Sequence, residues 1–401
     1  MKIIYSTDNY WPRVSGMAVS IDNFRRGLSD RGDEVHLFAP DYPGSVEEDR
    51  SKGRDHVHRL KARKVFFSPE DRLVRSSQRH KLEELMRSIG PDVIHVQTEF
   101  TMGRLTWEYA RSEGIPLVMT CHTYFEEYLG SYLPFIPNSL GRWYARSRTR
   151  RTFDLADVVV APTENMVKVL RGYGVKGRIE VIPTGMDPGR FSRSMESTEE
   201  DISGLFGPFP ELEGKRVLLT VGRIGKEKNL DFLVRATYPV LRNRSDVHWV
   251  IVGDGPYRVE MEKKVISLGV GGRATFTGYV DDDLLNLLYG FASVFVFASK
   301  TESQGLVTLE AMMSGTPVVA VGEMGTRDVM GGDNGGFMVP EDEGIFSRRV
   351  TQLLDDEGLW KAKSTEARCH SKSFTIESTS GRMRELYLGL LEAGPQKDIG
   401  E

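Results

Sequence analysis

Two glutamates, Glu302 and Glu310, stand eight positions apart in the stretch TESQGLVTLEAMMSG, with Gly305 between them. Ser303 is a suitable N-cap for a helix, and the start of a helix offers backbone N–H groups to an anion. Gly305 permits a close approach that a side chain would block. Carboxylates repel a phosphate but accept hydrogen bonds from sugar hydroxyls. The pattern therefore indicates a ligand with both phosphate and sugar, although a capped helix with two ordinary glutamates would also explain it.

A second polar group follows the apolar run RVLLTVG, in the stretch TVGRIGKEKN at 220–229. Arg223 and Lys228 come soon after the expected strand, so their side chains can reach a ligand at its carboxyl end. A forked guanidinium and a point-charge ammonium suit a diphosphate, and fixed positive charge stabilises such a group as it leaves. Taken alone, the two cations are equally compatible with solvated surface residues.

Three further positions carry weaker signals. His122 ends the run IPLVMTCH, where it is more accessible to a ligand than His95, which we expect in the core or behind a ligand-binding residue. Gly16, in PRVSGMAVSI, lets backbone approach a ligand, but the stretch is not the dinucleotide fingerprint and also suits a plain turn. The aspartates at 281–283 are placed to cap a helix rather than to bind a metal.

Short apolar runs alternate with longer helical patterns and must position these residues. Runs without polar alternation are typical of strands buried on both faces, which predicts parallel sheets covered by helices. We expect two such sheets, because 401 residues exceed one ordinary core. The expected strands contain KIIYS, EVHLFAP, DVIHVQ, PLVMTCH, DVVVAPT and IEVIPT in the first half, and RVLLTVG, HWVIVGDG, ATFTGYV, SVFVFAS and TPVVAVG in the second.

The joint between the two domains is predicted in the stretch from Gly185 to Gly214, which is rich in Gly, Pro, Ser and acidic residues and lacks sustained periodicity. The predicted domains are residues 1–185 and residues 186–376, the second including the linker. The tail contains ESTSGRMRELYLGLLE, with apolar residues at helical spacing. We therefore expect a helix within 377–401 to pack back onto the first domain.

Composition excludes several classes of protein. The chain is 39% apolar and 27% charged, as in soluble globular proteins. Cys121 and Cys369 are its only cysteines, which excludes a disulfide framework and favours a reducing compartment. The start MKIIYSTDNYWP does not read as a signal peptide, and no run reaches the roughly 18 apolar residues of a membrane-spanning helix. We expect a cytoplasmic protein that at most lies on a membrane.

Charge is divided unevenly along the chain. Residues 1–195 hold 30 Lys and Arg against 25 Asp and Glu, a balance of +5. Because the net charge of the whole chain is −4, residues 196–401 have a balance of −9. The excess of basic residues lies mainly at 59–81 and 141–151, where aromatic residues are interleaved. Each stretch alone suits a solvated face, and together they suit a surface resting on anionic lipid. Nothing resembles a nucleic-acid module, so we expect no nucleic-acid partner. The expected membrane and acceptor surface comprises Lys64, Phe66, Phe67, Arg72, Trp143, Arg148, Arg150 and Arg151.

Taken in order, these motifs resemble a known family. The stretch TESQGLVTLEAMMSGTPVVA looks like the E-x7-E signature of retaining glycosyltransferases of family 4, and PRVSG, VIPTGMD, GRIGKEKN and VGDGP match that family in its usual order. The resemblance covers nearly the whole chain. It implies the α/β fold called GT-B, in which two Rossmann-like domains with parallel sheets face a central cleft. The first domain would bind the acceptor and the second a sugar nucleotide.

The resemblance implies roles for the charged residues of the second domain. Glu310 should hold the ribose of the nucleotide, and Glu302 should bind hydroxyls of the donor sugar. Arg223 and Lys228 should neutralise the diphosphate, so that no divalent metal is strictly required. No cofactor is implied beyond the sugar nucleotide as substrate.

Other roles concern backbone groups and the first domain. Amides around Gly305 and Leu306 should help to hold the donor, His122 should contact the sugar, and Gly16 should leave room near the phosphates and the acceptor. The commonest family pattern has an aromatic residue where this chain has Gln304, a departure that bears on the subfamily. The expected catalytic residues are His122, Glu302, Arg223 and Lys228.

The stretches SKTESQGL and HTYFEEYLGSYLP resemble the bacterial branch that glucosylates 1,2-diacylglycerol. The implied reaction moves a hexose, with UDP-glucose as the expected donor, to a lipid hydroxyl with retention, giving an α-glycolipid. Such an enzyme would associate peripherally with the inner face of the cell membrane. Another donor or acceptor, such as GDP-mannose and a phosphoinositide, stays open, and the sequence does not indicate an oligomeric state or processivity.

Two rival functions remain compatible with the fold. A nucleotide-sugar epimerase would need no acceptor surface, and the E-x7-E pattern with the Arg/Lys pair argues against it. A non-catalytic protein that binds sugar nucleotides or lipids would not need every polar position to be present. Incubation with donor alone separates these possibilities, because only an epimerase converts it.

Overall fold

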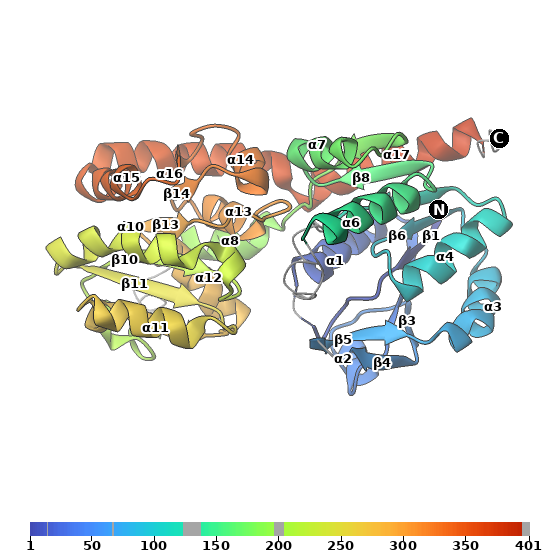
Figure 1. Ribbon diagram of the computed structural model, residues 1–401, viewed down its shortest axis with the longest axis horizontal. Coiled ribbons are helices and arrows are strands. Elements are labelled where there is room, and N and C mark those ends of the chain that lie inside the picture. Colours follow the sequence, from blue (N-terminus) through green and yellow to red (C-terminus); the bar gives the residue numbers. More distant parts are fainter. Residues whose placement is uncertain (14, 66–67, 123–137, 196–203, 395–401) are drawn as a thin grey trace. The chain divides into compact units, whose positions relative to one another are not determined.

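The computed structural model describes residues 1–13, 15–65, 68–122, 138–195 and 204–394 (Figure 1). The chain divides into two compact units. Unit 1 comprises Met1–Gly185 together with Ile376–Glu401, and unit 2 comprises Met186–Thr375. The C-terminal segment thus returns to the unit that contains the N-terminus.

Unit 1 is built on a seven-stranded sheet in which every pairing is parallel. Its spatial order is β3-β2-β1-β6-β7-β8-β9. A separate antiparallel pair follows the edge strand β3. The strands of the sheet are β1 (Lys2–Ser6), β2 (Glu34–Pro40), β3 (Val57–Leu60), β6 (Val93–Val96), β7 (Leu117–Thr120), β8 (Val158–Ala161) and β9 (Arg178–Val181), and the pair consists of β4 (Ala62–Val65) and β5 (Ser68–Val74).

Helices cover the sheet of unit 1, and the C-terminal helix packs against the first one. A Cβ atom added at Gly27 would lie 2.5 Å from Oγ of Ser380, so a glycine is needed where these two helices meet. Tyr387 and Met383 extend the buried core beneath the sheet. The helices are α1 (Gly16–Ser29), α2 (Ser45–Ser51), α3 (Arg79–Ile89), α4 (Thr101–Ser112), α6 (Asn138–Phe153), α7 (Glu164–Gly172) and α17 (Ile376–Ala393).

Unit 2 holds a six-stranded parallel sheet in the order β12-β11-β10-β13-β14-β15. The strands are β10 (Arg216–Val221), β11 (Val247–Val252), β12 (Ala274–Gly278), β13 (Val294–Phe297), β14 (Val318–Val321) and β15 (Gly336–Val339). The helices are α8 (Pro188–Met195), α10 (Leu230–Asn243), α11 (Arg258–Ser267), α12 (Asp282–Phe291), α13 (Leu306–Met313), α14 (Met324–Met330), α15 (Glu343–Asp355) and α16 (Glu357–Ser371), and a short 3₁₀ turn covers Lys226–Lys228.

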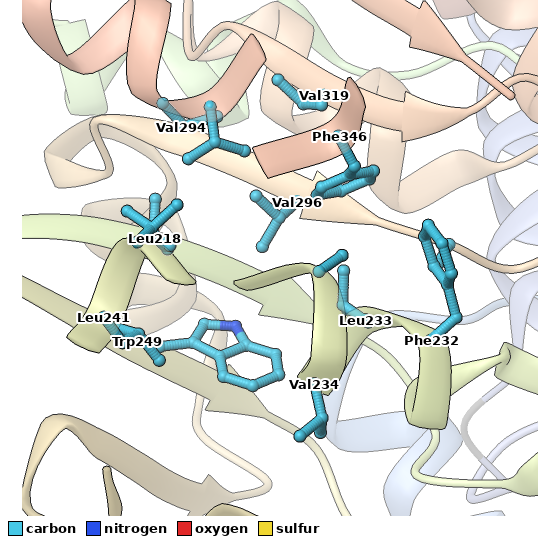
Figure 2. Close-up of a cluster of buried hydrophobic side chains, with 14 of the residues drawn as sticks. Leu218, Phe232, Leu233, Val234, Leu241, Trp249, Val294, Val296, Val319 and Phe346 are labelled. Atoms are coloured by element: carbon cyan, nitrogen blue, oxygen red, sulfur yellow. The ribbon is translucent and has the colours of Figure 1, made fainter. Parts of the chain in front are cut away.

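The sheet of unit 2 is buried on both faces, as its uninterrupted apolar runs predicted. Figure 2 shows one face, where Leu218 and Val296 of the sheet meet Leu233 of α10 and Phe346 of α15. Neighbouring residues of the same strands point to the opposite face, where they pack against a second set of helices. Continuous apolar strands are therefore explained by helices on both sides.

The stretch in which the joint was predicted packs into unit 2 over its described part, and unit 2 was the domain to which it was assigned. Residues 186–195 and 204–214 belong to unit 2, where helix α8 packs against α12. The side chains of Phe191, Leu205, Phe209 and Leu212 enter the core. The sequence did not indicate that these side chains are buried, because glycine, proline and acidic residues separate them and they form no continuous apolar run.

Both sheets reverse their winding at one pair of strands, which is where ligands bind in open α/β sheets. In unit 1 the reversal lies between β1 and β6, and in unit 2 it lies between β10 and β13. The loops that follow these strands therefore carry the candidate functional residues.

Candidate active site

In unit 2, the loop after β10 is held by close backbone packing. A Cβ atom at Gly253 would lie 2.1 Å from the carbonyl oxygen of Gly222, and one at Gly255 would lie 2.4 Å from that of Ile224. Glycines are therefore required where the loops after β10 and β11 touch. This packing fixes the segment that carries Arg223 and Lys228.

Lys228 and Glu302 meet at the reversal point of unit 2. The Nζ atom of Lys228 donates to Oε1 of Glu302 at 2.6 Å, and the two side chains are 22% and 18% exposed. Burial by itself raises the pKa of Glu302, but the charge and hydrogen bond of Lys228, with a hydrogen bond from Ser299, outweigh it and hold the pKa below its ordinary value. The glutamate is therefore a fixed anion, able to accept hydrogen bonds from a ligand.

The loop that carries Glu302 is also held by a segment further along the chain. The amide of Gly325, at the start of α14, donates to the carbonyl oxygen of Glu302 at 2.9 Å. A Cβ atom at Gly325 would lie 2.5 Å from Cα of Gln304, so only glycine allows this approach. Gln304, at the position where the commonest family pattern has an aromatic residue, is thus buried against α14.

Helix α13, which contains Glu310, starts later than predicted. Gly305 is its N-cap, with φ of +81°, and α13 begins at Leu306, so the expected cap at Ser303 was wrong. The left-handed backbone at Gly305 favours glycine over a serine cap. The first amides of α13 lack partners within the helix and border the loop of Glu302.

Glu310 lies inside α13 and is almost fully buried. The hydroxyl group of Tyr289, from α12, donates to its Oε2 atom at 2.7 Å. Burial raises the pKa of Glu310, and the hydrogen bond from Tyr289 and the charge of Arg190 only partly oppose it. Tyr289 therefore orients this carboxyl group, and sequence spacing gave no signal for that partner.

Arg223 is more exposed than Lys228 and pairs with a different glutamate. Its Nη1 atom lies 3.1 Å from Oε1 of Glu227, one turn further along the same loop. Half of its side chain is exposed, at 53%. The structure thus brings Lys228 and Glu302 together and leaves Arg223 at the rim of the same loop.

In unit 1, His122 follows β7 as predicted. Its Nε2 atom lies 2.7 Å from Oε1 of Gln97, which follows β6. Burial lowers the pKa of His122 to about 4, so its ring is neutral at pH 7.

His95 is a core residue, as expected, and bonds to Tyr387 and Thr120 at 2.6 Å each. Gly16 is the first residue of α1 and is exposed.

Two acidic residues at the same edge were not singled out from the sequence. Asp8 follows β1 and accepts hydrogen bonds from the amide of Met102 at 3.0 Å and the hydroxyl group of Thr98 at 2.9 Å. Glu99 follows β6, and Nη2 of Arg148 donates to its carbonyl oxygen at 3.2 Å. Burial raises the pKa of Asp8 to about 6 and that of Glu99 to about 7. His122 was found as a polar residue at the end of an expected strand. The same signal could have found Asp8 in STDNY and Glu99 in VQTEF.

Some residues of the predicted membrane surface are exposed, and others contact neighbouring parts of unit 1. Helix α6 presents Trp143 and Tyr144 to solvent, at 65% and 54% exposure, and Arg150 and Arg151 are also exposed. Arg148, from the same helix, is half-buried, because its guanidinium faces the loop of Glu99.

The other predicted surface residues lie near the antiparallel pair. Lys64 on β4 is exposed and opposes Arg72 on β5. The Arg72 guanidinium lies 5.2 Å from the ring centre of Tyr42, a cation–π contact that holds it in place. Phe66 and Phe67 lie outside the described residues.

Asp281 caps helix α12, and Asp282 and Asp283 lie in its first turn, as expected. Oδ1 of Asp281 accepts from the amide of Leu284 at 2.8 Å, and Asp282 pairs with Arg190 at 3.0 Å. Among the described residues, no helix is both long and apolar enough to cross a membrane.

Comparison with protein families gives two matches that cover most of the chain. Residues 14–190 match the model described as Glycosyltransferase Family 4, and residues 215–356 match the model described as Glycosyl transferases group 1. The first match lies in unit 1 apart from its last few residues, and the second lies in unit 2. The two units thus correspond to the two halves of one enzyme architecture.

Individual proteins agree with the family models. The chain is 32% identical over 326 residues to alpha-monoglucosyldiacylglycerol synthase of Streptococcus pneumoniae, covering 80% of this chain and 71% of that protein. It is 27% identical over 409 residues to the protein of the same name from Acholeplasma laidlawii, covering 99% of both chains. The crystal structure of HepE from Anabaena with UDP and glucose superposes with a TM-score of 0.77 at 17% identity, covering 97% of this chain and all of the other. The chain therefore belongs to glycosyltransferase family 4, and it is a hexosyltransferase with the GT-B fold.

Proposed function

We propose that the protein transfers glucose from UDP-glucose to the free hydroxyl group of 1,2-diacylglycerol, with retention at the anomeric carbon. The observation that carries this proposal is the similarity along 80% of the chain to a monoglucosyldiacylglycerol synthase. The charged pair of Lys228 and Glu302 supports it, because a cation and a fixed anion side by side suit a diphosphate joined to a sugar.

The donor is held by unit 2 in this proposal. Glu302 accepts hydrogen bonds from sugar hydroxyls, and Glu310, oriented by Tyr289, accepts them from the ribose. Lys228 contacts the diphosphate while keeping its bond to Glu302, since an ammonium group has three donors. Arg223, on the same loop, adds a second positive charge. Its guanidinium leaves Glu227 and binds a phosphate oxygen instead.

The reaction breaks the bond between the anomeric carbon and the diphosphate oxygen and forms a bond to the acceptor oxygen on the same face of the sugar. The proton of the acceptor hydroxyl passes to the departing phosphate. We prefer this route to a double displacement, because that route needs a carboxylate beside the anomeric carbon and the family roles give neither glutamate that position. Positive charge from Arg223 and Lys228 stabilises the leaving diphosphate in place of a divalent metal.

The acceptor is held by unit 1 in this proposal. His122 is neutral and bonded to Gln97, so it contacts the sugar as a hydrogen-bonding group rather than as a cation. Trp143 and Tyr144 are exposed on a helix that also carries arginines, a combination suited to the interface of an anionic membrane. The enzyme therefore works at the inner face of the cell membrane, where its acceptor resides.

A product assay tests this function directly. Purified protein is incubated with UDP-glucose, EDTA and vesicles that contain diacylglycerol and an anionic phospholipid. We expect an α-glucosyl lipid, and Glu302→Gln protein serves as a control that should form much less. If no lipid product forms although UDP raises the thermal midpoint, the donor site stands and the choice of sugar or acceptor is wrong. Conversion of UDP-glucose without acceptor would favour an epimerase instead.

A further inference from the structure

A cluster of three histidines and a glutamate lies at the amino-terminal end of β2 in unit 1. Glu34 and His36 belong to β2, His58 belongs to the edge strand β3, and His56 immediately precedes β3. The residues of unit 1 proposed to act in the reaction follow the carboxyl ends of its strands. The cluster therefore lies at the opposite end of the sheet, and the proposed reaction does not use it.

Three of these side chains present ligand atoms to one another. The Nε2 atom of His36 lies 2.8 Å from Oε1 of Glu34. One ligand atom from each of Glu34, His36 and His56 lies within 4.8 Å of the other two. The rings of His36 and His56 are centred 4.7 Å apart. Two imidazole nitrogens and a carboxylate oxygen at this spacing are a donor set that divalent transition metals prefer.

The backbone holds the three residues in this arrangement. Glu34 and His36 are two positions apart in a strand, so their side chains lie on the same face of the sheet. The amide of Leu37 donates to the carbonyl oxygen of His56 at 2.9 Å, which ties His56 to β2. His56 has φ of +58°, a left-handed conformation that ends the preceding turn and sets the direction of its side chain.

His58 controls which nitrogen of His36 is available. Glu34 is an ionised carboxylate that can only accept, so Nε2 of His36 carries the proton between them. In the neutral ring, Nδ1 of His36 then accepts from Nε2 of His58, 3.0 Å away. When a metal takes the place of that proton, both rings change tautomer and His36 donates through Nδ1 to His58. His58 stacks on Phe38, with ring centres 4.7 Å apart, and is thereby fixed for this role.

Charge in the neighbourhood permits a cation. Lys2 is the strand-register partner of Glu34, but its ammonium group donates to the carbonyl oxygen of Ile89 at 3.0 Å. The carboxylate of Glu34 therefore supplies the local negative charge.

We propose that Glu34, His36 and His56 form a binding site for a divalent transition metal, zinc in the first instance, with His58 as the residue that positions His36. Three protein ligands leave one tetrahedral position for water. At Zn–N and Zn–O distances of about 2.0–2.1 Å, ligand atoms of a tetrahedral site are roughly 3.3 Å apart. The contact between Glu34 and His36, now 2.8 Å, opens by about 0.5 Å to admit the ion. Such an ion joins β2 to the segment that leads into the edge strand β3.

The test uses the full chain, freed of any histidine tag and of metal by dialysis against a chelator. Binding of Zn²⁺ is measured by titration calorimetry, and Co²⁺ serves as a spectroscopic probe through its visible absorption. We expect one ion per chain, a higher thermal midpoint in the presence of Zn²⁺, and an absorption band typical of tetrahedral cobalt.

Variants separate this site from other metal-binding groups. His56→Ala and Glu34→Gln change exposed side chains, so both proteins should fold, and each should weaken Zn²⁺ binding by about tenfold or more. His58→Gln should weaken it by about 10–100-fold through the orientation of His36. The matched control is His80→Ala, which removes an exposed histidine 3.9 Å from Glu84 and should leave binding unchanged.

Two outcomes would overturn the site: no saturable binding by the unmodified chain, or binding that His56→Ala and Glu34→Gln leave intact. The result is independent of the proposed reaction. We expect both variants to transfer glucose at the rate of the unmodified protein, because the cluster lies away from the strand ends that carry the candidate active site. A protein that binds Zn²⁺ but forms no glycolipid would retain the metal site and refute the proposed function.

Discussion

Lys228 and Glu302, which are 74 positions apart in the sequence, meet through an ion pair of 2.6 Å at the reversal point of the unit 2 sheet. Both side chains are about four-fifths buried, so the pair is shielded from solvent but not sealed from a ligand. Lys228 lowers the pKa of Glu302 and keeps it ionised, and this is the geometry on which the proposed donor site depends.

Removing Lys228 should affect both stability and turnover. Lys228→Ala leaves Glu302 buried without its cation, and we expect a loss of about 2 kcal/mol in the free energy of unfolding, less than for a fully buried pair. Transfer should fall by about a hundredfold, because a preorganised positive charge is lost. Urea unfolding and the product assay measure the two effects. Arg235→Ala breaks an exposed pair with Glu343 and should cost little in either measurement.

Arg223 and Lys226 lie on the same loop and provide a matched comparison. Arg223→Ala should lower kcat by about a hundredfold, since its guanidinium is proposed to stabilise the leaving diphosphate. Lys226 is more exposed, at 76%, and lies over the ring of Tyr257, so Lys226→Ala should leave kcat within about twofold. Equal effects of the two substitutions would mean that the loop contributes only general positive charge.

Tyr289 should matter for the nucleotide more than for the chemical step. Tyr289→Phe removes the hydrogen bond that orients Glu310. We expect UDP to bind about fivefold to tenfold more weakly, in line with the roughly 1 kcal/mol of one hydrogen bond. Calorimetry with UDP measures the change. Tyr238→Phe, which removes an exposed hydroxyl bonded to Arg242, should not alter it.

Glu99 should make stability depend on pH. Its folded pKa of about 7 lies above the ordinary value of 4.5, so the unfolded chain loses this proton first as pH rises. Ionisation therefore destabilises the folded state between about pH 4.5 and 7, and the cost persists at higher pH. Glu99→Gln avoids it, so the urea midpoint of the variant relative to the unmodified protein should rise over this interval and then level off. Glu113→Gln, at an exposed pair with Arg87, should show no such rise.

The membrane surface can be tested on α6 without disturbing the acidic residues. Arg150 and Arg151 are exposed, whereas Arg148 contacts the loop of Glu99 and should be left in place. Replacing Arg150 and Arg151 with Ala should weaken binding to anionic vesicles, and the difference should shrink at high salt. Arg348→Ala with Lys361→Ala removes the same charge from exposed positions of unit 2 and is the control. Equal binding of all three proteins would exclude α6 as the docking surface.

The sequence by itself determined the class of fold and the residues at several strand ends. Uninterrupted apolar runs are local signals, so β7, β10 and β13 could be predicted directly, and with them the positions of His122, Lys228 and Glu302. The family motifs are local too, because each lies within one short stretch of the chain, and the expected roles of the two glutamates follow from such a stretch.

Tertiary structure alone decided which of these residues meet. Pairing of Lys228 with Glu302, and of Tyr289 with Glu310, depends on strand order and helix packing between distant segments. The same non-local packing placed Leu205, Phe209 and Leu212 in the core and brought His56 beside His36. A sequence records the apolar periodicity of each segment, but the partner of a polar side chain is set by the neighbouring strand or helix, and that neighbour is not adjacent in the chain.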